Sequence, residues 1–150
     1  MKRKIETYRL VLADDDEDDR ELFHEALKKL NTDFIFSAFP NGKKLVDHLK
    51  SPDTDLPDIV FLDLNMPIMD GMETLIAIRR DERLRSLPIA IYSTSTRQDD
   101  IEQTLANGAN VYISKPTDFS KLKEVLGKVL EMNWQFKSNG LNMEHYYLSF

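Results

Sequence analysis

Aspartate, serine and lysine side chains stand at the ends of apolar runs in this 150-residue sequence. Asp14 and Asp15 follow the run YRLVLA, and Asp63 comes directly after DIVFL. Ser93 ends the run IAIYS, and Lys115 follows VYIS. Three carboxylates in one cleft would repel one another unless a cation or a proton lay among them. Oxygen ligands of this kind favour a hard cation such as Mg2+, which keeps waters and phosphate oxygens in its coordination shell.

The same residue types suit phosphoryl transfer. A carboxylate such as that of Asp63 can act as a covalent nucleophile, and a bound metal ion can neutralise and align the incoming group. Lys115 would then pair with the phosphoryl oxygens, and Ser93 would donate a hydrogen bond to one of them. Positioning and charge neutralisation are most of what this reaction needs. The sequence therefore predicts a phosphoryl-accepting site centred on Asp63.

These residues can meet only if the apolar runs are strands of one sheet. The expected strands cover residues 8–13, 34–38, 58–62, 89–93 and 111–114. Apolar residues at helical spacing mark intervening helices over 22–30, 44–50, 72–80, 101–105 and 122–130, the last of them capped by Asp118. This alternation predicts right-handed crossovers and an α/β, doubly wound parallel sheet. Ligands of such sheets bind outside the carboxyl ends of the strands, which is where the residues above collect.

Composition limits the class of protein. Hydrophobic residues make up 41% and charged residues 31% of the chain, which is the balance of a soluble globular domain. No apolar run approaches the roughly 20 residues that cross a bilayer, and the N-terminus lacks the apolar segment of a signal peptide. Cysteine is absent, and the net charge of -6 argues against a nucleic-acid-binding surface. We expect a cytoplasmic domain with no direct nucleic-acid or membrane partner.

Four segments carry a family resemblance: VLADDDEDD, IVFLDLNMPIMDG, PIAIYSTS and YISKP. Together and in this order they are similar to the signature segments of response-regulator receiver domains of two-component systems, including the chemotaxis type. The resemblance covers residues 6–131. It implies a flavodoxin-like (βα)5 fold with a parallel five-stranded sheet in the order 2-1-3-4-5. We expect a receiver domain over 1–131 and a C-terminal apolar tail over 132–150.

The resemblance also implies a metal site. Asp63 would be the phosphoacceptor of a signalling protein that is not an enzyme and has at most slow self-catalysed phosphorylation and dephosphorylation. Asp15 would contact magnesium directly, and Asp14 would act mainly through water. Asp63 and the backbone carbonyl of Asn65 would complete the protein ligands.

Further residues take roles around the phosphoryl group by the same resemblance. Lys115 would bind its oxygens, and the Lys115–Pro116 bond would be cis. Ser93, with Thr94 beside it, would supply a hydroxyl to the phosphoryl group. Ser93 would move toward the phosphate and Tyr112 would swing inward, so that these two residues form the switch.

The expected partners follow from the resemblance as well. The segment 115–119 and Trp134 look like those of free-standing receivers that partner phytochrome-type kinases. The implied phosphodonor is a histidine kinase or a histidine phosphotransfer protein, and an unidentified downstream protein would receive the signal by contact. Apolar side chains fill the tail and would pack either on their own domain or in a homodimer: Trp134, Phe136, Leu141, Met143, Tyr146, Tyr147, Leu148 and Phe150.

Other interpretations stay open on the sequence alone. A phosphatase resembling the haloacid dehalogenase superfamily also uses an aspartate nucleophile, but that class has a second acid where Asn65 stands. A binding module that kept the fold without phosphorylation is a further alternative. A calcium loop over 14–25 would need glycine at its sixth position, which is Asp19. A solvated helix start is expected for the other acidic residues of this run: Asp16, Glu17, Asp18 and Asp19.

Overall fold

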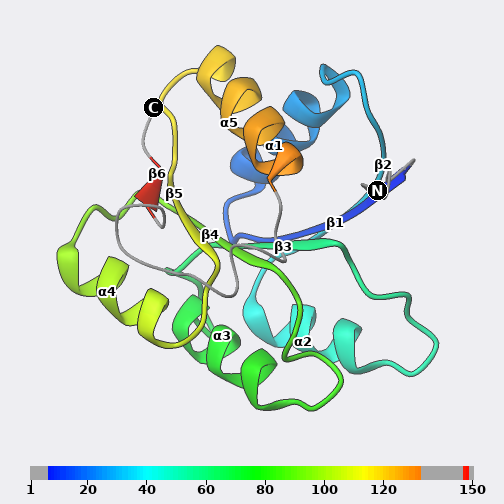
Figure 1. Cartoon of the computed structure of the whole chain (residues 1–150), viewed down its shortest axis with the longest axis vertical. Coiled ribbons are helices and arrows are strands. Elements are labelled where there is room, and N and C mark those ends of the chain that lie inside the picture. Colours follow the sequence, from blue (N-terminus) through cyan, green and yellow to red (C-terminus); the bar gives the residue numbers. More distant parts are fainter. Residues whose placement is uncertain (1–6, 133–146, 149–150) are drawn as a thin grey trace.

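A parallel sheet between two layers of helices forms the protein (Figure 1). The computed structural model describes residues 7–132 and 147–148. The strands are β1 (Thr7–Ala13), β2 (Asp33–Phe39), β3 (Ile59–Leu62), β4 (Ile89–Ser93), β5 (Val111–Ser114) and β6 (Tyr147–Leu148). The helices are α1 (Glu17–Lys28), α2 (Gly42–Lys50), α3 (Gly71–Arg80), α4 (Gln98–Ala106) and α5 (Phe119–Glu131).

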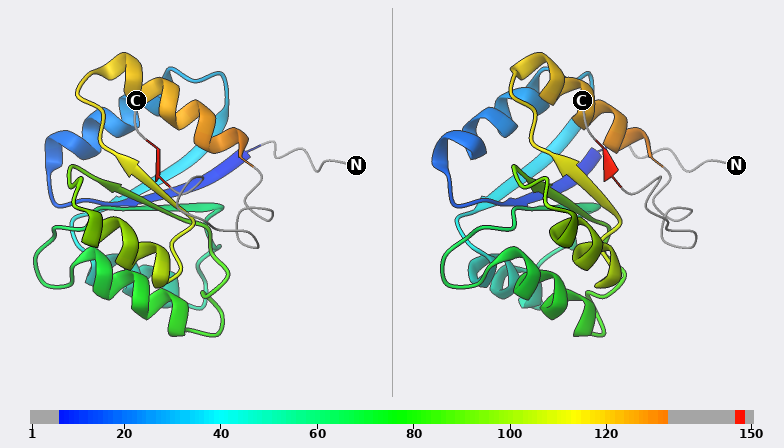
Figure 2. Two further views of the ribbon diagram at one scale, coloured as in Figure 1. Left: turned by 60° about the vertical axis from the view of Figure 1, so that its left-hand side comes forward. Right: turned by 90° about the vertical axis from the view of Figure 1, so that its left-hand side faces the viewer.

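The sheet order is β2-β1-β3-β4-β5-β6, and every pairing is parallel. The predicted order 2-1-3-4-5 is therefore confirmed for the first five strands. Helices α1 and α5 cover one face of the sheet, and α2, α3 and α4 cover the other (Figure 2). Within the described residues no helix is long and apolar enough to cross a bilayer.

The central strands are apolar on both sides because helices cover both faces of the sheet. Val60 and Leu62 of β3 belong to the core beneath α2, α3 and α4. Ile59 and Phe61 point the other way, into the core beneath α1 and α5. Successive residues of this central strand thus enter two separate cores, one on each face of the sheet. Its polar neighbour Asp63 comes only after the strand has ended.

Short polar side chains set the starts of four helices. Asp16 accepts a hydrogen bond from the amide of Asp19 at the start of α1, and Asn41 begins α2 in the same way. Asp70 and Glu73 form a reciprocal capping box on α3. Asp118 accepts from the amide of Lys121, so its predicted role as the cap of α5 is confirmed. Each cap satisfies amide groups that the first helical turn leaves unpaired.

Gly71 allows the chain after β3 to fold back against that strand. A side chain at Gly71 would place its Cβ 2.2 Å from the carbonyl oxygen of Asp63 and 2.6 Å from Cα of Leu64. The Gly71 amide donates to the carbonyl of Leu64 at 2.9 Å. The glycine therefore holds the loop tightly beneath the end of β3, where Asp63 stands.

The short strand β6 adds a sixth member to the predicted five-stranded sheet. Tyr147 pairs with Tyr112 and Leu148 pairs with Ile113 in parallel register. The rings of Tyr112 and Tyr147 lie 5.7 Å apart between centroids. The other apolar residues named in the tail, at 134–146 and 150, lie outside the described residues. The proposed boundary at 131/132 stays a prediction.

Arg79 joins the end of α3 to the segments around β4 and β5. Its Nε donates to the carbonyl of Gly108 at 2.9 Å, and Nη1 donates to the carbonyl of Leu87 at 2.7 Å. Nη2 donates to Oδ1 of Asn110 at 3.0 Å, and the same oxygen accepts from the amide of Ile89. One guanidinium group thus satisfies acceptors from several segments.

We expect Arg79→Met to lower the free energy of unfolding by about 2–4 kcal/mol, because partly buried acceptors would lose their donors. Urea unfolding followed by circular dichroism measures this change. Arg80→Met is the matched control, because Arg80 is the exposed neighbour on the same helix turn. It should change stability by less than about 0.5 kcal/mol. Equal effects of the two substitutions would contradict the bridging role of Arg79.

Candidate functional site

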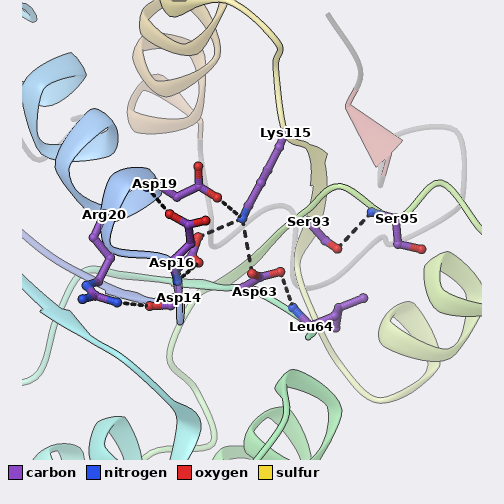
Figure 3. Close-up of polar contacts among 9 residues, drawn as sticks. All are labelled: Asp14, Asp16, Asp19, Arg20, Asp63, Leu64, Ser93, Ser95 and Lys115. Atoms are coloured by element: carbon purple, nitrogen blue, oxygen red, sulfur yellow. Dashed lines mark hydrogen bonds and ion pairs between the residues drawn. The ribbon is translucent and has the colours of Figure 1, made fainter. Parts of the chain in front are cut away.

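Asp63 lies where β3 ends, with its backbone and side chain both held. Its amide donates to the carbonyl of Ala13 at 3.0 Å, which fixes it against the end of β1. Its Oδ1 accepts from the amide of Leu64 at 2.8 Å, and its Oδ2 accepts from Nζ of Lys115 at 3.2 Å (Figure 3). The residue is only 6% exposed. Strand β1 therefore holds the backbone of Asp63, and Leu64 and Lys115 hold its carboxylate.

Asp14 and Asp15 extend the same edge from β1. Asp14 is fully buried, and its Oδ1 accepts from the amide of Asp16 at 3.0 Å. Its carbonyl accepts from Nη1 of Arg20 at 2.8 Å, which ties the end of β1 to α1. Asp15, in contrast, is exposed.

Three carboxylates lie close enough to share one cation. One oxygen each from Asp14, Asp15 and Asp63 lies within 4.8 Å of the others. This all-oxygen set with high negative charge fits Mg2+, which takes few protein ligands and keeps several waters. Asn65, the fourth expected ligand through its carbonyl, is an exposed residue two positions after Asp63. The donor set at this edge is thus compatible with the predicted cofactor.

Lys115 follows β5 and reaches into this group of acids (Figure 3). Its Nζ lies 2.8 Å from Oδ2 of Asp14 and 3.2 Å from Oδ2 of Asp63. The ammonium lies over the ring of Tyr92, with Nζ 5.2 Å from the ring centroid. The expected cis bond between Lys115 and Pro116 is wrong for this structure, because no described peptide bond is cis. The Lys115 ammonium contacts the carboxylates while the Lys115–Pro116 peptide bond is trans.

Asp19 also binds Lys115, a contact not expected from the sequence. Its Oδ2 lies 2.8 Å from Nζ of Lys115, so the expectation that Asp19 belongs only to a solvated helix start is wrong. A signal was present in the sequence. Asp19 stands one helical turn before Phe23, whose burial places that face of α1 against the sheet. An acid at this spacing can reach the strand ends while part of its side chain stays in solvent.

The hydroxyl residues lie on the β4 side of Asp63. Ser93 is fully buried, and its Oγ accepts from the amide of Ser95 at 3.1 Å. Figure 3 shows Ser93 near Asp63, with its hydroxyl turned toward Ser95. Thr94 is exposed. The structure therefore brings Ser93 to the site edge, and the roles expected for Ser93 and Thr94 stay predictions.

Tyr112 is buried in this structure. Its hydroxyl donates to the carbonyl of Ser95 at 2.8 Å. Ser95 in turn contacts Ser93 through its amide and Asp100 through its hydroxyl. Hydrogen bonds therefore run from the site edge at Ser93 to the expected switch aromatic. Movement of Tyr112 on phosphorylation stays a prediction.

Burial and charge act in opposite directions on the titrating groups. Burial raises the pKa of Asp63 to about 6, and the nearby Asp14 carboxylate adds to this, although Lys115 opposes it. Burial alone would lower the pKa of Lys115. Its hydrogen bonds to Asp14 and Asp19 and the charge of Asp63 outweigh burial, so that the pKa of Lys115 is raised. Lys115 therefore stays protonated at neutral pH. The pKa of Asp63, about 6, lies close to neutral pH.

A parallel (βα)5 sheet with acids after β1 and β3 and a lysine after β5 defines the receiver class of signalling domains. The chain matches the model of the response regulator receiver domain over residues 10–127. The chain belongs to this family, which serves two-component systems.

Relatives and solved structures agree with this assignment. The chain is 33% identical over 125 residues to the probable methanogenesis regulatory protein FilR2 of Methanothrix harundinacea, covering 81% of each chain. It is 32% identical to the chemotaxis protein CheY-3 of Vibrio cholerae, covering 82% of this chain and 92% of that protein. It resembles the phosphorylated cyanobacterial phytochrome response regulator RcpA at 29% identity and a TM-score of 0.77, covering 83% of this chain and 92% of that one.

We expect the raised pKa of Asp63 to destabilise the metal-free protein as the pH rises. The native carboxyl holds its proton up to about pH 6, whereas the unfolded one loses it near pH 4. The contribution of Asp63 to the free energy of unfolding is therefore greatest below about pH 4 and is lost as the pH rises through about 6. Asp63→Asn should stabilise the protein by about 1–3 kcal/mol at pH 7.5, and this gain should vanish near pH 4.

Urea unfolding across this pH range in the presence of EDTA tests the expectation. Asp53→Asn is the control, because Asp53 is an exposed acid in the segment between α2 and β3. A gain for Asp63→Asn that does not depend on pH would show that the carboxyl of Asp63 titrates at its ordinary value.

Proposed function

We propose that this receiver accepts a phosphoryl group on Asp63 from a histidine kinase or a histidine phosphotransfer protein. The observation that carries the proposal is the contact of Lys115 Nζ with both Asp14 and Asp63, beside three carboxylates that can share a cation. A buried lysine at a carboxylate cluster supplies positive charge where phosphoryl oxygens would arrive.

The reaction would move one phosphoryl group between two side chains. A carboxylate oxygen of Asp63 attacks the phosphorus of the donor phosphohistidine. The phosphorus–nitrogen bond breaks as the new oxygen–phosphorus bond forms, and the imidazole leaves with a proton from solvent. Lys115 pairs with a phosphoryl oxygen, and Ser93 donates a hydrogen bond to another, with Thr94 at the rim.

Magnesium would be held by Asp15, by Asp63, by the carbonyl of Asn65 and through water by Asp14. When bound, the cation offsets the negative charge of the acids and of the incoming group. The all-oxygen donor set, within 4.8 Å, supports this assignment.

Output would pass through protein contacts. We propose that the phosphoryl group draws Ser93 toward Asp63 and that Tyr112 and Ser95 rearrange with it. The hydrogen bonds from Ser93 to Ser95 and from Tyr112 to Ser95 support a linked movement. Similarity to RcpA supports a phytochrome-type kinase as the donor.

We expect the protein to gain one phosphoryl group when it is incubated with Mg2+ and acetyl phosphate. Asp63→Asn should abolish this gain, because an amide cannot form the acyl phosphate. Intact-protein mass spectrometry measures both results. Asp53→Asn should be labelled like the wild type, since Asp53 is exposed in the segment between α2 and β3. Labelling of Asp63→Asn, or repeated rapid turnover of phosphate esters as in a phosphatase, would overturn the proposal.

We expect Asp15→Asn to weaken Mg2+ binding by at least about tenfold, because one charged oxygen ligand is lost. Isothermal titration calorimetry measures the affinity. Asp15 is exposed, so the unfolding midpoint in EDTA should change little, which separates ligand loss from misfolding. Unchanged Mg2+ affinity would remove Asp15 from the proposed metal site.

A further inference from the structure

Lys115 has all three of its ammonium donors directed at carboxylates. An ammonium group carries three N–H donors. Oδ2 of Asp14 and Oδ2 of Asp19 each lie 2.8 Å from Nζ, and Oδ2 of Asp63 lies 3.2 Å away. The contact with Asp19 is thus as short as that with Asp14 and shorter than that with the proposed phosphoacceptor. Figure 3 shows the three acids around the ammonium.

For Lys115 to bind a phosphoryl oxygen, its ammonium would have to give up one of its three carboxylate contacts. Asp14 cannot easily withdraw, because its side chain is 0% exposed and its Oδ1 is held by the amide of Asp16. Asp63 carries the phosphoryl group itself and is 9% exposed at the side chain. Asp19 stands in the first turn of α1 with 36% of its side chain exposed, so that water can replace its contact with Lys115.

We infer that Asp19 is a positioning residue that holds Lys115 in the unphosphorylated protein and competes with the phosphoryl group for its ammonium. This role of Asp19 rests on the proposed function of Asp63. Asp19 is not one of the three acids that could share a cation, which are Asp14, Asp15 and Asp63.

The negative charge of Asp19, like its hydrogen bond to Lys115, opposes the transfer of the ammonium to a phosphoryl group. A carboxylate beside Lys115 draws the ammonium toward α1 and repels an incoming phosphoryl dianion. The contact is partly buried, so salt screens it less than it screens a fully exposed pair. Asp19 therefore makes phosphorylation slower than the remaining site would allow.

Asp19→Asn tests the inference, because it removes the charge and keeps the amide that bonds to the Asp16 cap. Asp18→Asn is the matched control: it removes the same charge from the same helix turn, and Asp18 is exposed. At saturating Mg2+ with acetyl phosphate, we expect Asp19→Asn to be labelled about threefold to tenfold faster than Asp18→Asn. Asp19→Glu should return the rate toward that of the wild type.

A second measurement needs neither metal nor phosphodonor. The 15N signal of the Lys115 ammonium should be protected from solvent exchange in the wild type and in Asp18→Asn, and less protected in Asp19→Asn. Equal labelling rates for the two asparagine variants, slower labelling of Asp19→Asn, or unchanged protection would overturn the inference. If the wild type is not labelled at all, the proposed function fails as well. Labelling of the wild type with no difference between the variants defeats only the role of Asp19.

Discussion

The arrangement of the acidic edge of the sheet depends on the Lys115 ammonium. It joins acids from the end of β1, the end of β3 and the first turn of α1. Buried charges of one sign are tolerated only when an opposite charge and hydrogen bonds compensate them. Without the lysine, the fully buried Asp14 of the metal-free protein would face Asp63 with no positive charge to offset the repulsion. One lysine thus faces three carboxylates at this edge of the sheet, so that its positive charge offsets only part of their negative charge.

The backbone keeps this unfavourable grouping in place. The amide of Asp14 donates to the carbonyl of Phe39, that of Asp63 donates to Ala13, and that of Lys115 donates to Ser93. The backbone of each of these three residues is therefore bonded to a neighbouring strand or strand end at the point where its own strand ends. Close approach of Gly71 beneath Asp63 tightens the same region. Sites built on rigid elements in this way keep their geometry when charge arrives.

Much of the fold could be predicted from the sequence because the apolar runs and their helical interruptions follow simple periods. Strand ends at Asp14, Asp63 and Lys115 could be located for the same reason, and topology then brought them together. Asp19 was missed because an acidic run favours a helix start in any case, which hid the inward face shared with Phe23. The geometry of the Lys115–Pro116 bond has no local signal, since cis and trans forms differ by only about 1 kcal/mol. Strand β6 has two residues, too few for any period to appear.

Strand β6 has a consequence for how the sheet meets its surroundings. A sheet edge presents unpaired amide and carbonyl groups, which can template pairing with another chain and lead to aggregation. Pairing of Tyr147 and Leu148 with Tyr112 and Ile113 occupies part of that edge on β5. Tyr147 and Leu148 thus occupy backbone groups of the strand that carries the buried Tyr112, and those groups are no longer open to pairing with another chain.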